Sequence, residues 1–464
     1  MSARILTPLA WAAGLLLAGC ATPPPTPSIT PEQALQQASV PLQLPVGAGG
    51  PADTPAAGWR DVVRQPRLVQ LVDLALLGNR DLRVTVLNVQ RAQAQLSVAD
   101  ANRLPTLGVG LTASRVPNAQ GHQTSSLLLG GLLSSWEIDL FGRLANLSDA
   151  ARAQLLASQA GQRAAELALA ATVVQAALAL QADDELLVLA RQSLASREQS
   201  LQLARLRESV GAASLLELQA QLGLAAQARA TLARLTRQQA QDANTLALLL
   251  GRPVPAALLL SAGSPQLESE GWLAEVPVGL SSAVLLRRPD VLAAEQSLRA
   301  AGANIGAARA AFWPTVTLTG QAGQVSSQLS NLFQGGHFAY TLATSALLTV
   351  FDAGRRQANV DTAVANQQIA QAQYERAIQT AFRDTADGLA GGVTWREQRV
   401  AVAAQREAAR ETSRLVELRT RQGAASVLEQ LEAERSLWEA EQAVVLVRLA
   451  ELLNRVALVK ALGG

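Results

Sequence analysis

The sequence contains an internal duplication, and this duplication limits its possible folds more than any other feature. Five residues of the first half recur 209 positions later (Pro105 and Pro314, for example). These pairs are Leu77 and Leu286, Asp81 and Asp290, Ala101 and Ala310, Pro105 and Pro314, and Thr106 and Thr315. Beyond Gly142 the offset is 212, and residues 211–217 match residues 423–429 at six of seven positions. The chain must therefore form two similar repeats, and the three-residue difference must lie between Pro105 and Gly142.

The hydrophobic pattern changes period in the same order within each repeat. Helical spacing over residues 66–102 and 281–311 gives way to an alternation of polar and apolar residues, which is typical of strands with two different faces. Each repeat therefore contains one predicted β-hairpin, at about residues 104–140 and 313–351.

Glycine turns separate the long helical segments that follow each hairpin. In each repeat a helix of about 60 residues ends at a tip, at about residues 209–214 and 421–426, and a helix of about 35 to 40 residues returns. Ser214 and Ser426 are suited to cap the returning helices, and a glutamate three residues further on would complete each capping box. Leucines recur every seven residues from Leu180 to Leu201. These patterns predict two antiparallel coiled-coil hairpins.

The N-terminus is predicted to be a targeting segment. Residues 1–19 combine an early arginine, an apolar stretch and small residues, which is typical of a signal peptide. The ending Leu17-Ala18-Gly19-Cys20 resembles the lipobox of bacterial lipoproteins, which implies that Cys20 becomes the acylated, palmitate-bearing first residue. Ala21 stands where an aspartate favours the inner membrane, so the resemblance implies a lipid anchor in the outer membrane.

These signals define the expected domain organisation of the mature chain. Residues 20–58 are rich in proline and are predicted to be an extended, lipid-anchored tether. The first structural repeat is expected at 59–251 and the second at 281–464. Residues 252–280 form an equatorial linker between the repeats, with a possible short helix around Trp272.

The composition provides few of the side chains that usually bind metals or act as nucleophiles in enzymes. With one cysteine and two histidines, a metal or thiol site would have to combine residues that are far apart in the sequence. His122 and His337 fall in the predicted outer strand loops, where solvation is expected. The 39 basic and 37 acidic residues give a net charge of +2, which argues against nucleic-acid binding through bulk charge. We therefore expect no enzyme activity, no cofactor, no metal site and no nucleic-acid partner.

Two hairpins supply only four strands per chain, too few to close a barrel. The strands have the length that crosses a bilayer, and in a membrane their edges must pair with further strands. Three chains would supply twelve strands, which makes a cyclic trimer the smallest assembly that fits.

Aromatic residues gather at the helix-proximal ends of the predicted strands. They are Trp136, Phe141, Phe312, Trp313 and Phe351. An interfacial girdle of aromatic side chains is expected there in a membrane barrel. The alternative is ordinary side-chain contact where helix meets strand.

The combined features resemble the outer-membrane efflux proteins of the TolC and OprM type, including the NodT-type lipoprotein channels. The resemblance rests on the lipobox, the tether, the duplicated pattern and the segments 136–143 (WEIDLFGR) and 350–356 (VFDAGRR). It implies a mainly α fold with transmembrane β, in which a homotrimer forms a twelve-stranded barrel and a twelve-helix periplasmic tunnel.

The same resemblance implies a function and partners. The trimer would be the exit duct of a tripartite efflux pump that passively conducts small toxic compounds or drugs to the exterior. It would dock with a periplasmic adaptor (membrane fusion) protein and an inner-membrane transporter of the RND type. Its localisation would be the outer membrane, in contact with lipid and extending into the periplasm.

The resemblance also implies a periplasmic gate beside the second glycine turn. Arg419 and Glu432 lie on opposite arms of one hairpin and would be the gate ions, bridged between neighbouring chains. Ala424 and Leu428 would line the constriction. Thr420 stands where family members often have a tyrosine, so a tyrosine latch is in doubt. The alternative is that both ions are solvated surface charges.

The two tips are the best candidates for contact with the adaptor, because small residues permit the close approach of another helical hairpin. The candidate residues are Gly211, Ala212, Ser214, Gly423 and Ser426. The same residues also serve to turn the chain, and the two roles are compatible.

Two other functions are open at this point. A type I protein-secretion duct would share the same architecture. A structural coiled-coil lipoprotein that tethers envelope layers would explain the helices, but it has no use for two strand hairpins with alternating faces.

Overall fold

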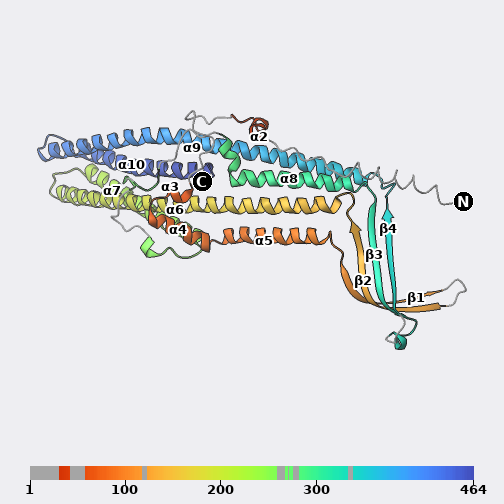
Figure 1. The fold of residues 1–464 in the computed structure, drawn as a ribbon. Coiled ribbons are helices and arrows are strands. Elements are labelled where there is room, and N and C mark those ends of the chain that lie inside the picture. The colour runs from red at the N-terminus through yellow and green to blue at the C-terminus, as the bar shows by residue number, and fades with distance from the viewer. Residues whose placement is uncertain are drawn as a thin grey trace, which may run out of the picture. The chain divides into compact units, whose positions relative to one another are not determined.

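Figure 1 shows the computed structural model, which describes residues 31–41, 58–117, 123–258, 267–269, 271–274, 282–332 and 338–463. Cys20, the signal peptide and both histidines lie outside these residues. The elements in chain order are α2 (Pro31–Gln37), α3 (Trp59–Val62), α4 (Pro66–Gly78), α5 (Arg80–Ala101), β1 (Leu107–Pro117), β2 (Gln123–Ile138), α6 (Arg143–Ser209), α7 (Leu215–Leu250), η1 (Ala256–Leu258), η2 (Ser282–Arg287), α8 (Pro289–Ala310), β3 (Thr315–Ser326), η3 (Leu329–Asn331), β4 (Phe338–Leu347), α9 (Arg355–Arg421) and α10 (Val427–Ala461).

The described residues belong to two compact units. The strand unit contains Leu87–Ala160 and Leu292–Arg376, and therefore all four strands with the adjoining helix segments. The helical unit contains Pro31–Val86, Gly161–Val291 and Ala377–Gly464.

In the strand unit, β1 to β4 form one antiparallel sheet in the order β1-β2-β3-β4 (Figure 1). Both predicted hairpins are therefore present. Gly130 of β2 lies opposite Gly323 of β3, and a Cβ atom on Gly130 would lie 2.2 Å from the carbonyl oxygen of Ala322. This close approach of the two backbones fixes the register between hairpins that are far apart in the sequence.

The helical unit is built on the predicted long helices. α6 and α9 each have 67 residues, and they return as α7 with 36 and α10 with 35. Leu180, Leu187 and Leu201 of α6 are buried, as the seven-residue repeat predicts. The core brings together α4, α6, α7 and α10, through residues that include Leu71, Val72, Val174, Leu178, Leu187, Leu246, Leu250, Leu452 and Val456.

Among the described helices, α6 is long and apolar enough to cross a membrane by length and composition. Its apolar residues Val173, Val174 and Leu178 are fully buried within the helical unit. We therefore interpret α6 as a core helix.

The helical spacing predicted over residues 66–102 corresponds to two helices, because Asn79 separates α4 from α5. The Asn79 side chain explains the break. Its Oδ1 accepts a hydrogen bond from the amide of Leu82 at 2.9 Å, and its Nδ2 donates to the carbonyl of Leu249 at 2.9 Å. Asparagine thus ends one helix, caps the next and ties both to the end of α7.

The helix predicted over residues 281–311 is also interrupted. Residues Ser282–Arg287 form the 3₁₀ helix η2, and α8 begins at Pro289. Proline fits the first turn of a helix, because its missing amide donor would have no partner there. The proline at position 289 therefore already indicated in the sequence where α8 begins.

The linker and the tether also differ from expectation. Trp272 lies in a bend instead of a short helix. It is followed by Leu273, which forms an isolated bridge with Val63, and the amide of Ala274 donates to the carbonyl of Val62 at 2.7 Å. Within the tether, Pro31–Gln37 is the helix α2 instead of extended chain. Its apolar residues are buried, and Nε2 of Gln379 donates to the carbonyl of Ala38 at 2.9 Å.

We expect Gly78→Ala to destabilise the helical unit by about 1–3 kcal/mol. The added methyl group enters a space that is already filled, so the backbone has to shift. A Cβ atom on Gly78 would lie 2.3 Å from the carbonyl oxygen of Leu250, far inside van der Waals contact. Gly223→Ala on α7 is the control, because its added Cβ meets no atom within 4 Å and alanine favours the helix. Thermal unfolding in detergent would contradict the prediction if Gly78→Ala unfolded no earlier than the control.

Candidate channel-forming and docking surfaces

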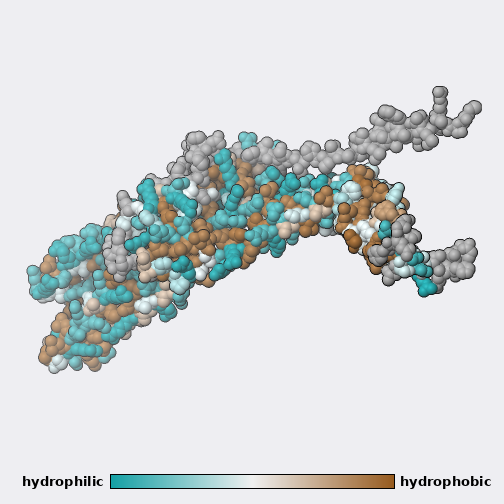
Figure 2. Space-filling view, turned by 60° about the horizontal axis from the view of Figure 1, so that its bottom comes forward, coloured by the Kyte–Doolittle hydropathy of each residue, from teal (hydrophilic) through white to brown (hydrophobic). Residues whose placement is uncertain are grey.

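The register of the sheet sorts the side chains into two different faces. Cross-strand partners share a face, and one face carries apolar residues and glycines in three consecutive rows, with Gln324 as the polar exception. These rows are Leu107–Leu133–Gly320–Leu342, Val109–Gly131–Ala322–Tyr340 and Leu111–Leu129–Gln324–Phe338. We call them the apolar face of the sheet. Figure 2 shows that apolar residues gather over the strands.

The opposite face of the sheet is polar near the helices. Thr317 lies opposite Ser345, and their hydroxyl oxygens are 2.7 Å apart. Gln321 lies opposite Thr341, and Glu137 lies opposite Thr317. A sheet with one apolar and one hydroxyl- and amide-bearing face is suited to separate lipid from water.

Both edges of the sheet are open within the described chain. β1 and β4 each pair with only one neighbouring strand. Their apolar residues are strongly exposed, at 85% for Val109 and 77% for Tyr340. An exposed, apolar strand edge is a site for pairing with another chain.

The segment 136–143 makes the turn from β2 into α6. Gly142 adopts a left-handed conformation (φ +75°), and Arg143 binds Glu137 through two hydrogen bonds of 2.8 and 2.5 Å. The pKa of Arg143 is raised, chiefly by the hydrogen bond to Glu137. Phe141 stacks on Trp313, with ring centroids 5.2 Å apart. The charge pair holds the turn within the first repeat, and the ring stack joins the two repeats where strands meet helices.

In the second repeat, the equivalent segment 350–356 also contains a charge pair at the turn from strand to helix, but it uses different residues. Asp352 accepts a 2.8 Å hydrogen bond from Nε of Arg356, whose guanidinium also lies 5.1 Å from the ring of Phe312. Partial desolvation tends to raise the pKa of Asp352, but the hydrogen bonds from Arg356 outweigh it and hold the pKa below its usual value. The motif is recognisable in the sequence, but the sequence does not indicate which of its charges pair.

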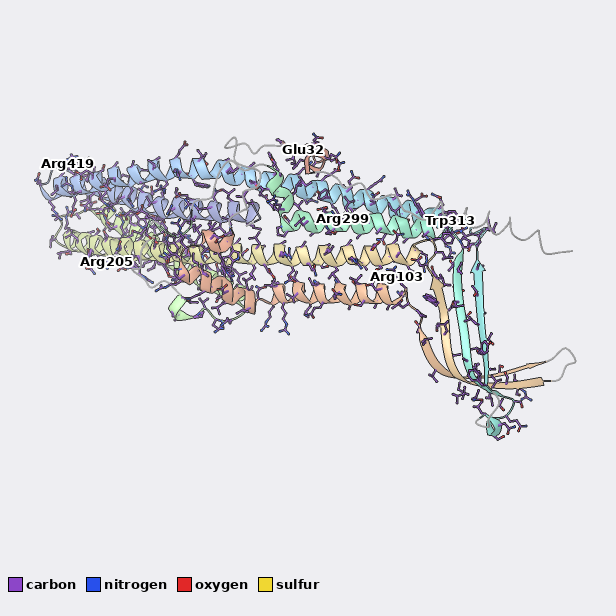
Figure 3. All side chains as sticks on the ribbon, in the orientation of Figure 1. Glu32, Arg103, Arg205, Arg299, Trp313 and Arg419 are labelled. Carbon is purple, nitrogen blue, oxygen red and sulfur yellow. The ribbon has the colours of Figure 1, made fainter. Side chains whose placement is uncertain are left out.

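Two roles were considered for the five aromatic residues: an interfacial girdle, and side-chain contacts where helix meets strand. Phe141 and Trp313 contact each other, and Nε1 of Trp136 donates to the carbonyl of Arg103 at 3.0 Å. Phe351 is 86% exposed. Trp313 and Arg103 are marked at the helix ends next to the strands in Figure 3. Contact at the junction is therefore observed for four of these side chains, including Phe312 beneath the guanidinium of Arg356, and the membrane-interface role stays a prediction.

The second tip holds the residues predicted to form the gate. Within the chain, Nη2 of Arg419 donates to the carbonyl of Ala424 at 2.9 Å, which pins the turn at the end of α9 (Figure 3). Glu432 pairs with Arg435 on the same helix. Arg419 and Glu432 are thus engaged separately inside one chain, and both are exposed, as is Leu428.

The first tip contains the duplicate of this arginine, which sequence analysis missed. Arg207, 212 positions before Arg419, donates to the carbonyl of Ala212 at 3.4 Å and pairs with Glu217 at 3.3 Å. The repeat offset was the signal that could have identified it.

The helix caps at the tips are confirmed in part. Gly211 and Gly423 adopt the predicted left-handed conformation, with φ of +75° and +73°. Ser426 and Glu429 form the predicted capping box. Ser214 caps α7 through its hydroxyl, but Glu217 turns towards Arg207 instead of completing a box. Both tips expose small residues to possible partners.

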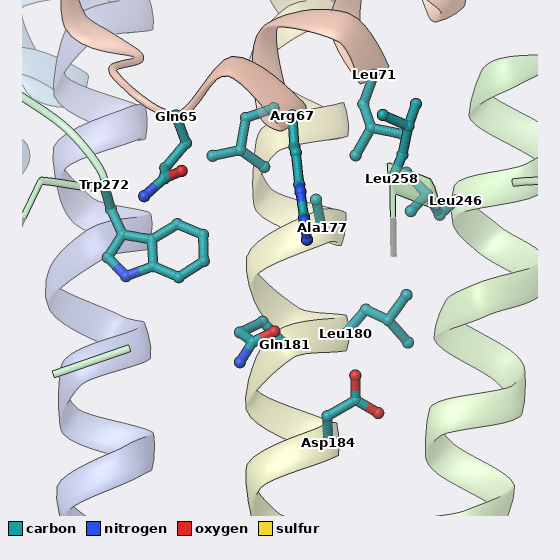
Figure 4. Close-up of a pocket in the computed structure, with 11 residues that line it drawn as sticks. Gln65, Arg67, Leu71, Ala177, Leu180, Gln181, Asp184, Leu246, Leu258 and Trp272 are labelled. Carbon is teal, nitrogen blue, oxygen red and sulfur yellow. The ribbon is translucent and has the colours of Figure 1, made fainter. Parts of the chain in front are cut away.

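A small pocket lies in the core of the helical unit (Figure 4). Its volume of about 30 Å³ suits one water molecule and no larger solute. Oε1 of Gln181 and Nε1 of Trp272 at this pocket have no hydrogen-bond partner among the described residues. It is lined by Gln65, Arg67, Leu68, Leu71, Ala177, Leu180, Gln181, Asp184, Leu246, Leu258 and Trp272.

An open four-stranded sheet with an apolar face, joined to long paired helices, defines the protomer of a TolC-like channel. The chain belongs to the outer membrane efflux protein family, whose sequence profile matches residues 71–252 and 280–464.

Similar proteins support this assignment over nearly the whole chain. The probable efflux pump outer membrane protein TtgC of Pseudomonas putida is 39% identical over 465 residues, which cover 97% of this chain and 93% of that protein. Outer membrane protein OprJ of Pseudomonas aeruginosa is 40% identical, covering 88% of this chain and 86% of OprJ. The MtrE outer membrane channel of Neisseria gonorrhoeae, crystallised in its open state, superimposes with a TM-score of 0.83 at 34% identity, covering 96% and 98% of the two chains.

The predicted family and TolC-like fold are thus confirmed, and the family is one of channels and not of enzymes.

Proposed function

We propose that this chain assembles as a homotrimer into the outer-membrane exit duct of a tripartite efflux pump. The family is that of outer-membrane efflux channels. The observation that carries the trimer is the sheet, which has two open edges and one apolar face. Pairing β1 of one chain with β4 of the next, three times, gives a closed barrel with every edge satisfied.

The cargo we propose is small apolar or amphipathic toxic compounds, such as organic solvents and antibiotics. Relatives with nearly full coverage are named a toluene efflux pump protein, a solvent efflux pump protein and an antibiotic efflux pump protein. These names favour small-molecule efflux over type I protein secretion. A purely structural lipoprotein would leave the apolar face of the sheet without a role.

The proposed partners follow from the pump. The exposed tips around Gly211 and Gly423 would meet a periplasmic adaptor protein, and an inner-membrane transporter of the RND type would supply the energy. The lipid anchor on Cys20 would hold the trimer at the outer membrane, since several acyl chains together bind a bilayer stably.

Light scattering coupled to size-exclusion chromatography of the detergent-extracted protein tests the assembly. We expect a particle of three chains that conducts ions in planar bilayers. A folded, strand-containing monomer without conductance would contradict the proposed duct.

The gate makes a separate prediction. If Arg419 and Glu432 bridge neighbouring chains, Arg419→Ala and Glu432→Ala should each raise single-channel conductance several-fold, because a partly desolvated ion pair resists opening. The double variant should add little, because both changes remove one interaction.

Arg421→Ala is the matched control for the gate. Arg421 lies at the same tip and pairs with Glu417 on its own helix. Equal conductance in Arg419→Ala, Glu432→Ala and this control would show that the two gate candidates are solvated surface charges.

A further inference from the structure

The two strand hairpins contain almost no charge. Residues 104–136 and 315–351, which cover both hairpins up to their junctions with the helices, include a single Asp, Glu, Lys or Arg residue, and it is Arg115 of β1. The carboxylate of Glu137 lies at the opposite, helix-proximal end of β2 and pairs with Arg143. Every copy of the chain has the same strands, so a neighbouring copy offers no carboxylate to Arg115 either.

The register of the sheet places Arg115 on the apolar face. It lies opposite Ser125, four residues further out along each strand than the pair Leu111–Leu129. The pairing runs without a register shift along the whole of β1, so alternate residues keep the same face. Among the described residues the Arg115 side chain is exposed and has no hydrogen-bond or ion-pair partner. In the proposed barrel this guanidinium group therefore faces lipid.

The depth of Arg115 in the proposed barrel follows from strand geometry. Trp136, the predicted interface residue, pairs with Leu318, and Leu107 belongs to the next row outwards. Arg115 is another eight residues along β1. These ten residue steps, at about 3.4 Å each and with a strand tilt of about 40°, rise about 26 Å, and the apolar band of outer-membrane barrels is about 25 Å tall. Arg115 thus lies at the outer edge of this band, at the level of the lipid headgroups.

Neighbouring residues mark the same boundary. On the apolar face of β3, the first polar residues towards this end are Gln324 and Ser326. The aromatic residues Phe338 and Tyr340 lie on the same face of β4, and they are 65% and 77% exposed. Aromatic side chains and the change to polar residues are typical of a membrane interface. A lipid-facing arginine is costly at the midplane of a barrel but is tolerated at this level.

We propose that Arg115 binds the phosphate group of a lipid in the outer leaflet of the outer membrane, while the acyl chains of that lipid lie on the apolar face of the sheet. A guanidinium group matches a phosphate through charge-assisted hydrogen bonds, often two in parallel. The hairpins offer no carboxylate that would compete for it. This inference rests on the proposed barrel, which gives the apolar face its lipid and Arg115 its depth.

Native mass spectrometry of the detergent-extracted full chain tests this lipid site. The probes are phosphatidylglycerol, which carries a net negative charge, and phosphatidylcholine, in which the choline group balances the phosphate. We expect phosphatidylglycerol to bind at least about fivefold more tightly than phosphatidylcholine. Arg115→Gln should lower this preference at least about threefold, and Arg115→Lys should keep most of it because the charge remains.

A paired exchange keeps the composition and moves the charge to the other face of the sheet. Ser114 lies on that opposite face, where its hydroxyl is 2.7 Å from the hydroxyl of Ser126. The double variant Ser114→Arg/Arg115→Ser should therefore lose the lipid preference as Arg115→Gln does. Arg91→Gln is the matched control, because Arg91 is exposed on α5, outside the strands, and its removal should leave the preference unchanged.

Three results would overturn the proposal. They are equal binding of the two lipids by the unchanged protein, a full preference in Arg115→Gln, and a full preference in the exchange variant. The charge would then serve only to protect the open edge of β1 from wrong pairing. The same spectra count the chains in each particle. A trimer without lipid preference contradicts this site alone, and a monomer contradicts the proposed duct.

Discussion

Leu342→Arg should nearly abolish assembly of the chain in the outer membrane. Leu342 lies in the middle of β4, on the apolar face, in the row with Leu107, Leu133 and Gly320. A lipid-facing arginine near the midplane of a β-barrel costs about 2–4 kcal/mol, so three copies in the proposed trimer would cost about 6–12 kcal/mol. We expect the yield of extracted trimer to fall more than about tenfold.

The neighbouring residue supplies the control. Thr341 precedes Leu342 on the same strand but points to the opposite face, where it lies opposite Gln321. Thr341→Arg adds the same charge at the same depth, facing the water-filled interior of the proposed barrel. We expect its trimer yield within about twofold of the unchanged protein. Equal losses in both variants would contradict the assignment of the two faces.

Asp183→Asn should stabilise the helical unit above neutral pH. Asp183 of α6 is only 6% exposed, and its Oδ2 has no hydrogen-bond partner among the described residues. Burial, together with a hydrogen bond and the charge of Asp242 on α7, raises the pKa of Asp183 from 3.8 to about 7. Asp184 adds a smaller repulsion.

The direction of the pH effect follows from proton binding. Between about pH 4 and pH 7 the folded chain keeps a proton on Asp183 that the unfolded chain releases. Raising the pH through this window therefore lowers the free energy of unfolding, and above it the loss stays constant. Each unit of pKa shift corresponds to about 1.4 kcal/mol. Allowing for partial solvation, we expect Asp183→Asn to gain about 1–3 kcal/mol at pH 8 and almost nothing at pH 4.

Thermal unfolding of the unchanged protein and of Asp183→Asn at pH 4 and pH 8 measures this difference. Asp242→Asn is the second variant, because its amide can donate to an ionised Asp183 and should reduce the pH dependence as well. The prediction is contradicted if the difference between Asp183→Asn and the unchanged protein is the same at both pH values.

The sequence predicted the elements well because the signals for them are local. These signals act within a few residues of the chain. They are the left-handed glycines at 211 and 423, the serine caps at 214 and 426 and the alternation along the strands. The same signals failed where a distant group changed the outcome. Asn79 breaks a strongly helical stretch because its side chain reaches the carbonyl of Leu249, 170 residues away.

The same distinction between local signals and distant contacts applies to the candidate functional residues. Cys20, Arg419, Glu432 and the tips came from motifs and from the repeat, and their proposed roles depend on membrane and partners. The charge pairs at the strand-to-helix junction and the arginines around Glu451 were missed, because nothing in the spacing of Arg399, Arg448 and Arg455 indicates that they converge on Glu451.

The two repeats, the type and order of their elements and the membrane-crossing length of the strands thus follow from local sequence signals. Each depends on periodicity or on conformational preferences of single residues. The folded chain was needed to find the register that places Gly130 against Gly323, the two faces of the sheet and the charges that meet in the helical unit. These depend on contacts between segments far apart in the chain, which the packing of backbones and side chains selects and local sequence does not record.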